Sequence, residues 1–162
     1  MRTKRIGKWL LETELHMHLN DEETLSWLLE NSSITQRISA MAIFKLEIIR
    51  DQLGLTSMDQ YLALGLFPQP VRVREVILSG DNRPMVHAKS IIPFLTSYKG
   101  YPELGKIGSK PLGDLIFTSN LFVKQSRVFA PFLEHGHASK IWGRRTNYSV
   151  QGYPFSIMEV FL

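Results

Sequence analysis

Two charged residues lie inside otherwise apolar segments, and both could take part in chemistry. Residues 71–78 alternate as a β-strand does, which places Arg74 on the apolar face of that strand. The same alternation over residues 155–162 places Glu159 on an apolar face. A guanidinium does not lose its charge, so Arg74 needs an anion wherever that face is buried.

Three arrangements are open for Arg74 and Glu159. They could be edge-strand charges that reach solvent, or they could pair with each other in a structural salt bridge, and isolated charges on strands most often do one of these. Alternatively, they form the two polar ends of an internal pocket. In that case Arg74 would hold a ligand carboxylate, and Glu159 would hold a hydroxyl group or a transferable proton.

Other motifs point to simpler roles. The pairs His16/His18 and His135/His137 have no third ligand cluster nearby, so we expect exposed loop histidines and no metal site. The glycine-rich residues 105–110 lack the spacing of a phosphate-binding P-loop. No Gly-x-Ser-x-Gly motif is present, which argues against a serine hydrolase.

Composition limits the class of protein. The chain has 162 residues, 44% of them hydrophobic and 21% charged, which fits one folded domain spanning residues 1–162. No cysteine is present, which excludes disulfides, thiolate metal sites and cysteine nucleophiles. The net charge of +4 suits an anionic small molecule. The sequence lacks the stripe of interleaved basic and aromatic residues that is typical of proteins that bind nucleic acid, so we expect no nucleic-acid partner. Without a signal-peptide core or a membrane-length apolar run, we expect a cytoplasmic protein.

The elements that must position these residues are mostly strands. An acidic first turn predicts a helix over residues 21–30, Ser33 can cap a further helical turn, and a short helix is expected near residues 57–62. Residues 1–20 carry no readable period. The glycine- and proline-rich residues 94–114 indicate a functional loop or lid. Six strands are expected, over residues 42–52, 71–78, 85–93, 121–129, 141–150 and 155–161.

The order of these elements indicates an α+β fold. The strands follow one another through hairpin-type turns and not through helical crossovers, so the sheet should be antiparallel. We therefore expect a single antiparallel six-stranded sheet with flanking helices, and with helical or loop lids over an internal site.

Four separated motifs together resemble the chorismate–pyruvate lyase family. They are REVIL at residues 74–78, LGKIGSKPLG at 104–113, WGRR at 142–145 and MEVFL at 158–162. Their order and spacing match the family over roughly residues 25–162. The resemblance implies the same antiparallel α+β fold with an enclosed site.

The resemblance also implies a reaction and site residues. The reaction converts chorismate to 4-hydroxybenzoate and pyruvate without a metal or organic cofactor. Arg74 then corresponds to the residue that binds the ring carboxylate, and Glu159 to the residue that contacts the ring hydroxyl. Ile34, where the family often has methionine, and Leu112 would line the site partly through their backbone. Lys89 stands where the family tends to have arginine, and lysine does not reproduce the bidentate arginine fork.

The chemistry needs few protein groups. Aromatisation drives the loss of the enolpyruvyl group, so the protein mainly orients the substrate and stabilises charge on the departing oxygen. Arg144 and Arg145 are further candidates for binding the enolpyruvyl carboxylate, but adjacent strand residues face opposite ways, so at most one of them can reach it.

The sequence leaves open the pathway that uses the product, ubiquinone or another phenolic. It also leaves open the oligomeric state, with a monomer favoured.

A rival function belongs to another class. The effector-binding domains of some bacterial transcription regulators share this fold and sense small molecules without catalysis. Those domains are normally fused to a DNA-binding helix-turn-helix. Only about twenty to thirty residues precede the first firmly expected helix here, fewer than the roughly 60 that an independent domain usually requires, so the lyase is the preferred expectation.

Overall fold

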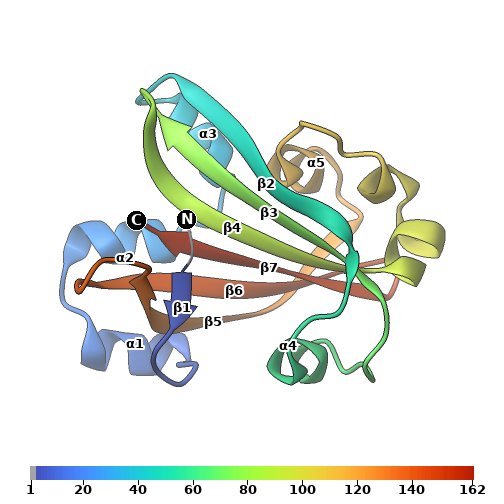
Figure 1. The fold of residues 1–162 in the computed structure, drawn as a ribbon, viewed down its shortest axis with the longest axis horizontal. Helices are drawn as coiled ribbons and strands as arrows, with labels where there is room; N and C mark the ends of the chain where they lie inside the picture. The colour runs from blue at the N-terminus through green and yellow to red at the C-terminus, as the bar shows by residue number, and fades with distance from the viewer. Residues whose placement is uncertain (1–2) are drawn as a thin grey trace.

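The computed structural model describes residues 3–162, which form one strongly curled sheet with short helices around it (Figure 1). The strand order is β1-β5-β6-β7-β4-β3-β2, and every neighbouring pair is antiparallel. The strands are β1 Thr3–Arg5, β2 Phe44–Gly54, β3 Val71–Gly80, β4 Arg83–Pro93, β5 Phe122–Glu134, β6 Lys140–Val150 and β7 Tyr153–Phe161.

The expected α+β class and antiparallel sheet are confirmed, but the number of strands was wrong. The sheet has seven strands instead of six, because β1 pairs with the edge of β5. A strand of three residues contains too few positions for a period-2 pattern, so only its pairing defines it.

The helices are short. They are α1 Glu12–His18, α2 Glu22–Leu28, α3 Ile34–Ser39, α4 Met58–Ala63, the π-helical turn η1 Thr96–Gly100, the 3₁₀ turn η2 Pro102–Gly105 and α5 Leu112–Thr118. As expected, Ser33 caps α3 and accepts a hydrogen bond from the amide of Gln36 (3.3 Å). Asp21 caps α2 in the same way and accepts from the amide of Thr24 (2.8 Å). Helix α5 begins in the last residues of the stretch expected to be a loop, directly after Pro111 and without a side-chain cap.

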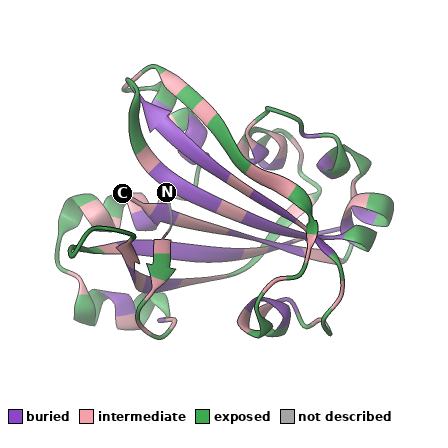
Figure 2. Ribbon diagram, viewed as in Figure 1, coloured by how far each residue is buried: buried purple, intermediate pink, exposed green. Residues whose placement is uncertain are grey.

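Helices cover both faces of the sheet. Helix α3 packs Ile34 and Ile38 against β3 and β4, and α5 packs Leu112 and Ile116 against the same face at its other end. Helix α4 packs Tyr61 against the opposite face. Figure 2 shows buried positions concentrated in the central strands, with the outer strand β2 mostly exposed or intermediate. Among the described residues, no helix is long and apolar enough to span a membrane.

Candidate active site

A narrow cavity lies between helices α3 and α5 and the sheet face formed by β3, β4 and β7. About 50 Å³ of its interior is open to the centre of a water molecule. The structure brings four of the five residues singled out from the sequence to this cavity: Ile34, Arg74, Leu112 and Glu159. Ile34 and Leu112 are the first residues of α3 and α5, so the starts of both helices form its cover.

Two small side chains form the part of the cavity floor that lies between the charged residues. Ala88 and Ser90 of β4 lie between Arg74 on β3 and Glu159 on β7. Arg74 pairs in register with Ser90, and Glu159 pairs with Ala88. Because alternate residues of a strand share one face, all four side chains point to the same side of the sheet. The small residues leave space between two charged ends.

Arg74 forms one end of the cavity and is almost fully buried, with 2% of its surface exposed. Its Nη1 donates to Asp51 Oδ2 (2.8 Å) and to the Gly108 carbonyl (2.8 Å), and its Nη2 donates to the Lys110 carbonyl (3.0 Å). A guanidinium has five N–H groups. Within the described chain, Nε–H and one N–H on Nη2 therefore remain for a ligand.

Asp51 holds two arginines of β3 at once. Arg72 donates to both oxygens of its carboxylate, at 2.6 and 2.7 Å, while Arg74 shares one of them. These contacts, with the hydrogen bonds from Arg72 as the largest cause, hold the pKa of Asp51 below its usual value of 3.8. The pair of arginines keeps a net positive charge at this end.

A β-bulge brings Asp51 to the cavity face. Simple alternation along β2 would place Asp51 with Lys45 and Glu47, on the face opposite Leu46. The register shifts between Ile48 and Arg50, so Asp51 pairs with Arg74 and shares its face. One extra residue in a strand reverses the facing of every later side chain, and for this reason sequence alternation missed Asp51.

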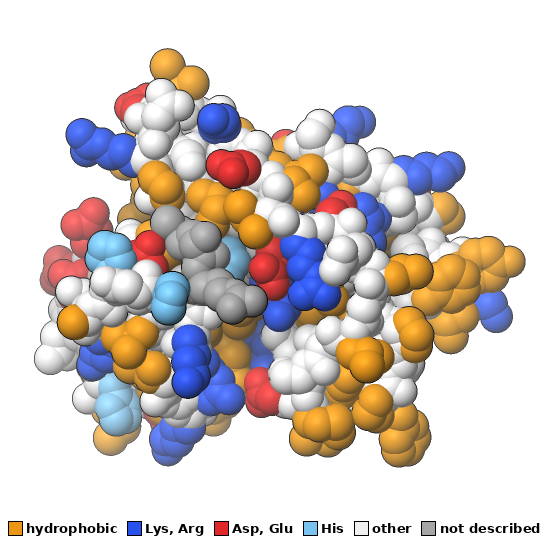
Figure 3. Space-filling model, in the orientation of Figure 1, with side chains coloured by type: hydrophobic (Ala, Val, Ile, Leu, Met, Phe, Trp, Pro, Cys, Tyr) orange, Lys and Arg blue, Asp and Glu red, His pale blue; other side chains and the backbone are white. Residues whose placement is uncertain are grey.

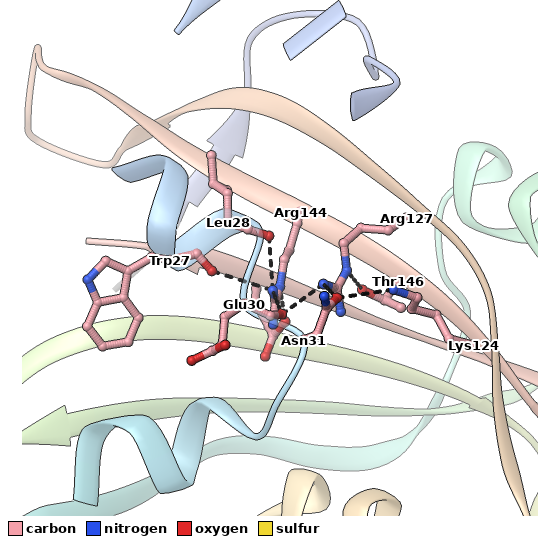
Figure 4. A network of polar contacts seen from close by, with 9 residues as sticks. Trp27, Leu28, Glu30, Asn31, Lys124, Arg127, Arg144 and Thr146 are labelled. Carbon is pink, nitrogen blue, oxygen red and sulfur yellow. Dashed lines mark hydrogen bonds and ion pairs between the residues drawn. The ribbon is translucent and has the colours of Figure 1, made fainter. Parts of the chain in front are cut away.

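Glu159 forms the other end with Arg144. Its Oε2 accepts from Arg144 Nε at 2.6 Å, and both side chains are largely buried. Arg144 Nη1 also donates to the carbonyls of Leu28 (3.0 Å) and Glu30 (2.6 Å), where α2 ends (Figure 4). The last carbonyls of a helix lack internal partners and carry partial negative charge, so an arginine is favourable there. Glu159 Oε1 has no hydrogen-bond partner in the described structure and can accept from a ligand.

Arg74 and Glu159 do not pair with each other. Their partners are Asp51 and Arg144, respectively. Of the three arrangements that the sequence left open, the structure has two charged residues at separate ends of one cavity. The carboxylate of Asp51 holds Arg74, and the guanidinium of Arg144 holds Glu159. The alternation of residues in the sequence did not identify either partner.

A second, outer pocket adjoins the cavity. Both hollows share Ile116, Phe117 and Tyr148, and the outer one adds Lys124 and Arg127 from β5. Burial and the nearby Glu159 carboxylate raise the pKa of Tyr148, so its hydroxyl stays protonated at neutral pH. Burial and the neighbouring charge of Arg144 lower the pKa of Arg127. Lys124 and Arg127 carry no recognisable sequence signal, because they resemble ordinary exposed charges on a strand.

Lys89 lies elsewhere. It points to the opposite face of the sheet, 3.5 Å from Glu75, in a broad hollow that also contains Arg50 and His87. Ser90, its neighbour on β4, occupies the cavity face, so strand alternation separates Lys89 from Arg74. Arg145 also faces away from the cavity and pairs with Asp59 at 2.9 Å.

The outer face carries mixed charge. Acidic and basic side chains lie next to one another over the side of the molecule seen in Figure 3, where β1 and β2 are in front. Residues 3–162 contain no group of three or more His, Asp or Glu side chains arranged to hold a metal ion.

Comparison with known proteins identifies the family of this chain. The model of the family described as chorismate lyase matches residues 5–162. The chain belongs to the chorismate lyase family. A probable chorismate pyruvate-lyase of Pseudoalteromonas atlantica is 37% identical over 152 residues, covering 85% of this chain and 78% of the relative. A chorismate pyruvate-lyase of Shigella sonnei is 30% identical, covering 88% and 84%.

Solved structures of regulators share the fold of this chorismate lyase family member. The effector domain of PhnF from Mycobacterium smegmatis has a TM-score of 0.60 at 14% identity, covering 82% of this chain and 90% of that domain. A ligand-binding domain of a putative GntR-family regulator from Bordetella bronchiseptica has a TM-score of 0.56, also at 14% identity. At such identity the likeness concerns the fold alone.

Proposed function

We propose that this chain is a lyase that converts chorismate to 4-hydroxybenzoate and pyruvate. The observation that carries this proposal is a covered cavity with a cationic end at Arg74 and a carboxylate end at Glu159. Membership of the chorismate lyase family selects this reaction among those that an anion-binding cavity could support.

The substrate fits the two ends in one orientation. The ring carboxylate binds the free N–H groups of Arg74, and Ala88 and Ser90 face the ring between the two ends. The ring hydroxyl on the opposite carbon reaches Glu159 Oε1. Ile34 and Leu112, at the starts of α3 and α5, cover the bound ring.

The reaction then needs one proton transfer and one bond cleavage. The ring carbon that bears the hydroxyl loses its hydrogen as a proton, and the C–O bond at the neighbouring carbon breaks. The electrons of the C–H bond complete the aromatic ring, and enolpyruvate leaves and takes up a proton to become pyruvate. Glu159 lies next to the carbon that loses the proton, and nearby guanidinium groups stabilise charge on the departing oxygen.

The decisive experiment mixes the purified protein with chorismate and follows both products. We expect pyruvate and 4-hydroxybenzoate to appear in equal amounts. No product at high protein concentration would contradict the lyase proposal. Binding of chorismate without turnover would instead favour a non-catalytic ligand-binding role, as in the ligand-binding domain of the regulator from Bordetella bronchiseptica.

Replacing Arg74 tests the cationic end. We expect Arg74→Ala to abolish measurable turnover and to weaken 4-hydroxybenzoate binding by roughly 10- to 100-fold, because a charge-assisted bidentate contact is lost. Folding should survive, since Asp51 keeps Arg72 as a partner, and circular dichroism checks this. Arg83→Ala, at the exposed β3–β4 turn, is the matched control. An active Arg74→Ala enzyme would remove Arg74 from the site.

We further propose that the enzyme acts in the cytoplasm as a monomer on small molecules, with no nucleic-acid or membrane partner. A single chain supplies both charged ends, the floor and the cover of the cavity. Size-exclusion chromatography with light scattering tests the monomer, which a stable dimer at working concentration would contradict.

A further inference from the structure

Two cations beside the cavity have only neutral partners. Arg127 is half-buried, and its Nε donates to the Thr146 hydroxyl at 2.8 Å. Its Nη1 donates to the Glu30 carbonyl at 2.9 Å and, more weakly, to Asn31 Oδ1 at 3.4 Å. Lys124 Nζ donates to the same Asn31 oxygen at 3.3 Å (Figure 4).

This arrangement differs from that of the other arginines on the cavity face. Arg74 has Asp51 and Arg144 has Glu159 as an ionic partner. In residues 3–162, by contrast, no carboxylate lies within 4 Å of Arg127 or Lys124. Arg127 is half-buried beside the exposed Lys124, and an anion that contacts both would offset the repulsion between these like charges.

Arg127 and Lys124 lie in the outer pocket, which adjoins the cavity that contains Glu159. The hydrogen bonds to Thr146, Glu30 and Asn31 use Nε and Nη1 of Arg127, and its guanidinium also interacts with the neutral Tyr148 hydroxyl. Both cations line the outer pocket that meets the cavity at Ile116, Phe117 and Tyr148. Arg127 and Thr146 are partners in the β5–β6 register. Thr146 lies two residues from Arg144, the partner of Glu159, so Arg127 shares their face.

Chorismate carries a second carboxylate that the two ends of the cavity do not bind. With the ring carboxylate at Arg74 and the ring hydroxyl at Glu159, the enolpyruvyl ether starts from the carbon beside the hydroxyl. Its carboxylate therefore lies on the Glu159 side of the ring, toward β5. We propose that Arg127 and Lys124 bind the enolpyruvyl carboxylate of chorismate, an inference that rests on the proposed lyase function.

The product 4-hydroxybenzoate allows the proposed subsite to be tested separately from the rest of the site. 4-Hydroxybenzoate retains the ring carboxylate and the hydroxyl but has lost the enolpyruvyl carboxylate. The cations on β5 therefore contact only the substrate and the departing pyruvate. Removing these cations should weaken the binding of chorismate and leave the affinity for 4-hydroxybenzoate unchanged. A general disturbance of the cavity would weaken the binding of both molecules.

The test compares Lys124→Met and Arg127→Met with the wild type. We expect Arg127→Met to raise KM for chorismate about 10- to 100-fold, as expected for the loss of a hydrogen-bonded charge, and Lys124→Met to have a smaller effect. The dissociation constant of 4-hydroxybenzoate, measured by calorimetry, should stay within about twofold. Arg127→Lys should restore part of the loss, and Arg83→Met is the control for an exposed arginine.

Several outcomes would overturn the subsite. An equal loss of affinity for chorismate and for 4-hydroxybenzoate would show a structural role for Arg127. Unchanged KM in both variants would show that neither cation binds substrate. If Arg127→Met does not fold, Lys124→Met decides the matter, because Lys124 is exposed and its side chain makes one hydrogen bond, to Asn31, within residues 3–162.

The same variants separate this inference from the lyase proposal. If the wild type binds chorismate without turning it over, calorimetry can still compare the dissociation constants of chorismate for the wild type and the variants. Weaker chorismate binding in the variants would then support the subsite although the lyase function had failed. A wild type that turns over chorismate and variants that match it would leave the lyase intact and overturn only the subsite.

Discussion

Arg74 and Glu159 are each held by a partner that leaves atoms free toward the cavity. Asp51 and two backbone carbonyls fix the guanidinium of Arg74, and Arg144 fixes the carboxylate of Glu159. A side chain held in this way loses little freedom when a ligand binds, which is the physical content of preorganisation.

Glu159→Gln distinguishes proton transfer from positioning. The amide oxygen can still accept from Arg144, but the group no longer takes up a proton. We expect turnover to fall by about 100-fold or more and 4-hydroxybenzoate affinity to fall much less, as for loss of a general base. Steady-state kinetics and calorimetry measure the two quantities. An equal loss of both would instead mean that Glu159 only positions the ring hydroxyl.

Asp51→Asn tests the charge shared by Arg72 and Arg74. Removing the carboxylate leaves two neighbouring guanidinium groups without an ionic partner, so we expect the free energy of unfolding to drop by roughly 2–4 kcal/mol at pH 7. The pKa of Asp51 is lowered in the folded protein, so its stabilisation is present above its unfolded pKa and is lost as the pH falls through the folded value. Urea denaturation at neutral and acidic pH measures both effects. Asp114→Asn is the exposed control, and equal stability of both variants would contradict the prediction.

Sequence patterns identified the two ends of the site but not their neighbours. Arg74 and Glu159 stood out because each interrupts an apolar strand face. Asp51 lies after a bulge that no local pattern reveals, and Arg127 depends on contacts with Glu30 and Asn31, almost 100 residues away in the chain. Periodicity reports which face a side chain occupies only while the ladder is regular.

At the level of elements, hairpins and capped helices were predictable. The β3–β4 turn has positive φ at Asp81 and Asn82 (49° and 62°), a conformation that these residue types tolerate, so turn chemistry located it. Helix α5 was missed because Pro111 precedes it in place of a Ser, Thr or Asp cap, and because glycine and proline dominate the residues before it. Its stability comes from packing Leu112 and Ile116 on the sheet.

Ser33→Ala tests the start of α3, one of the two helices that cover the cavity. The side chain accepts from the amide of Gln36, and losing a cap of this kind costs about 1 kcal/mol. We expect the free energy of unfolding to fall by about that amount in denaturant titration. Ser39→Ala, at the exposed end of the same helix, should change it by less than about 0.5 kcal/mol. No difference between the two variants would show that the cap does not stabilise α3.

Over the whole molecule, His87 should link stability to pH. It is 5% exposed on the outer face of β4, near Glu75 and Lys89, and its Nδ1 lies 2.8 Å from the Thr3 hydroxyl. Burial lowers its pKa below the usual 6.5, so the folded protein favours the neutral ring. The unfolded chain takes up a proton first as the pH falls, and the stabilisation present above about pH 6.5 is lost below it.

His87→Gln should therefore flatten the loss of stability between pH 7.5 and pH 5.5, as measured by urea denaturation at several pH values. The exposed His135→Gln variant should keep the wild-type profile. Identical profiles for His87→Gln and the wild type would show that His87 titrates alike in the folded and unfolded states.

The register of β4 with its two neighbouring strands sets the distance between the two ends of the cavity. Arg74 and Glu159 are two strands apart, and their β4 partners Ser90 and Ala88 are two residues apart. With strands about 4.8 Å apart and a rise of about 3.4 Å per residue, the two backbone positions are separated by roughly 12 Å, from which both side chains reach inward. The backbone ladder thus sets the length of ligand that can touch both ends, and a slip of β4 against β7 would change that length without altering any residue that contacts the ligand.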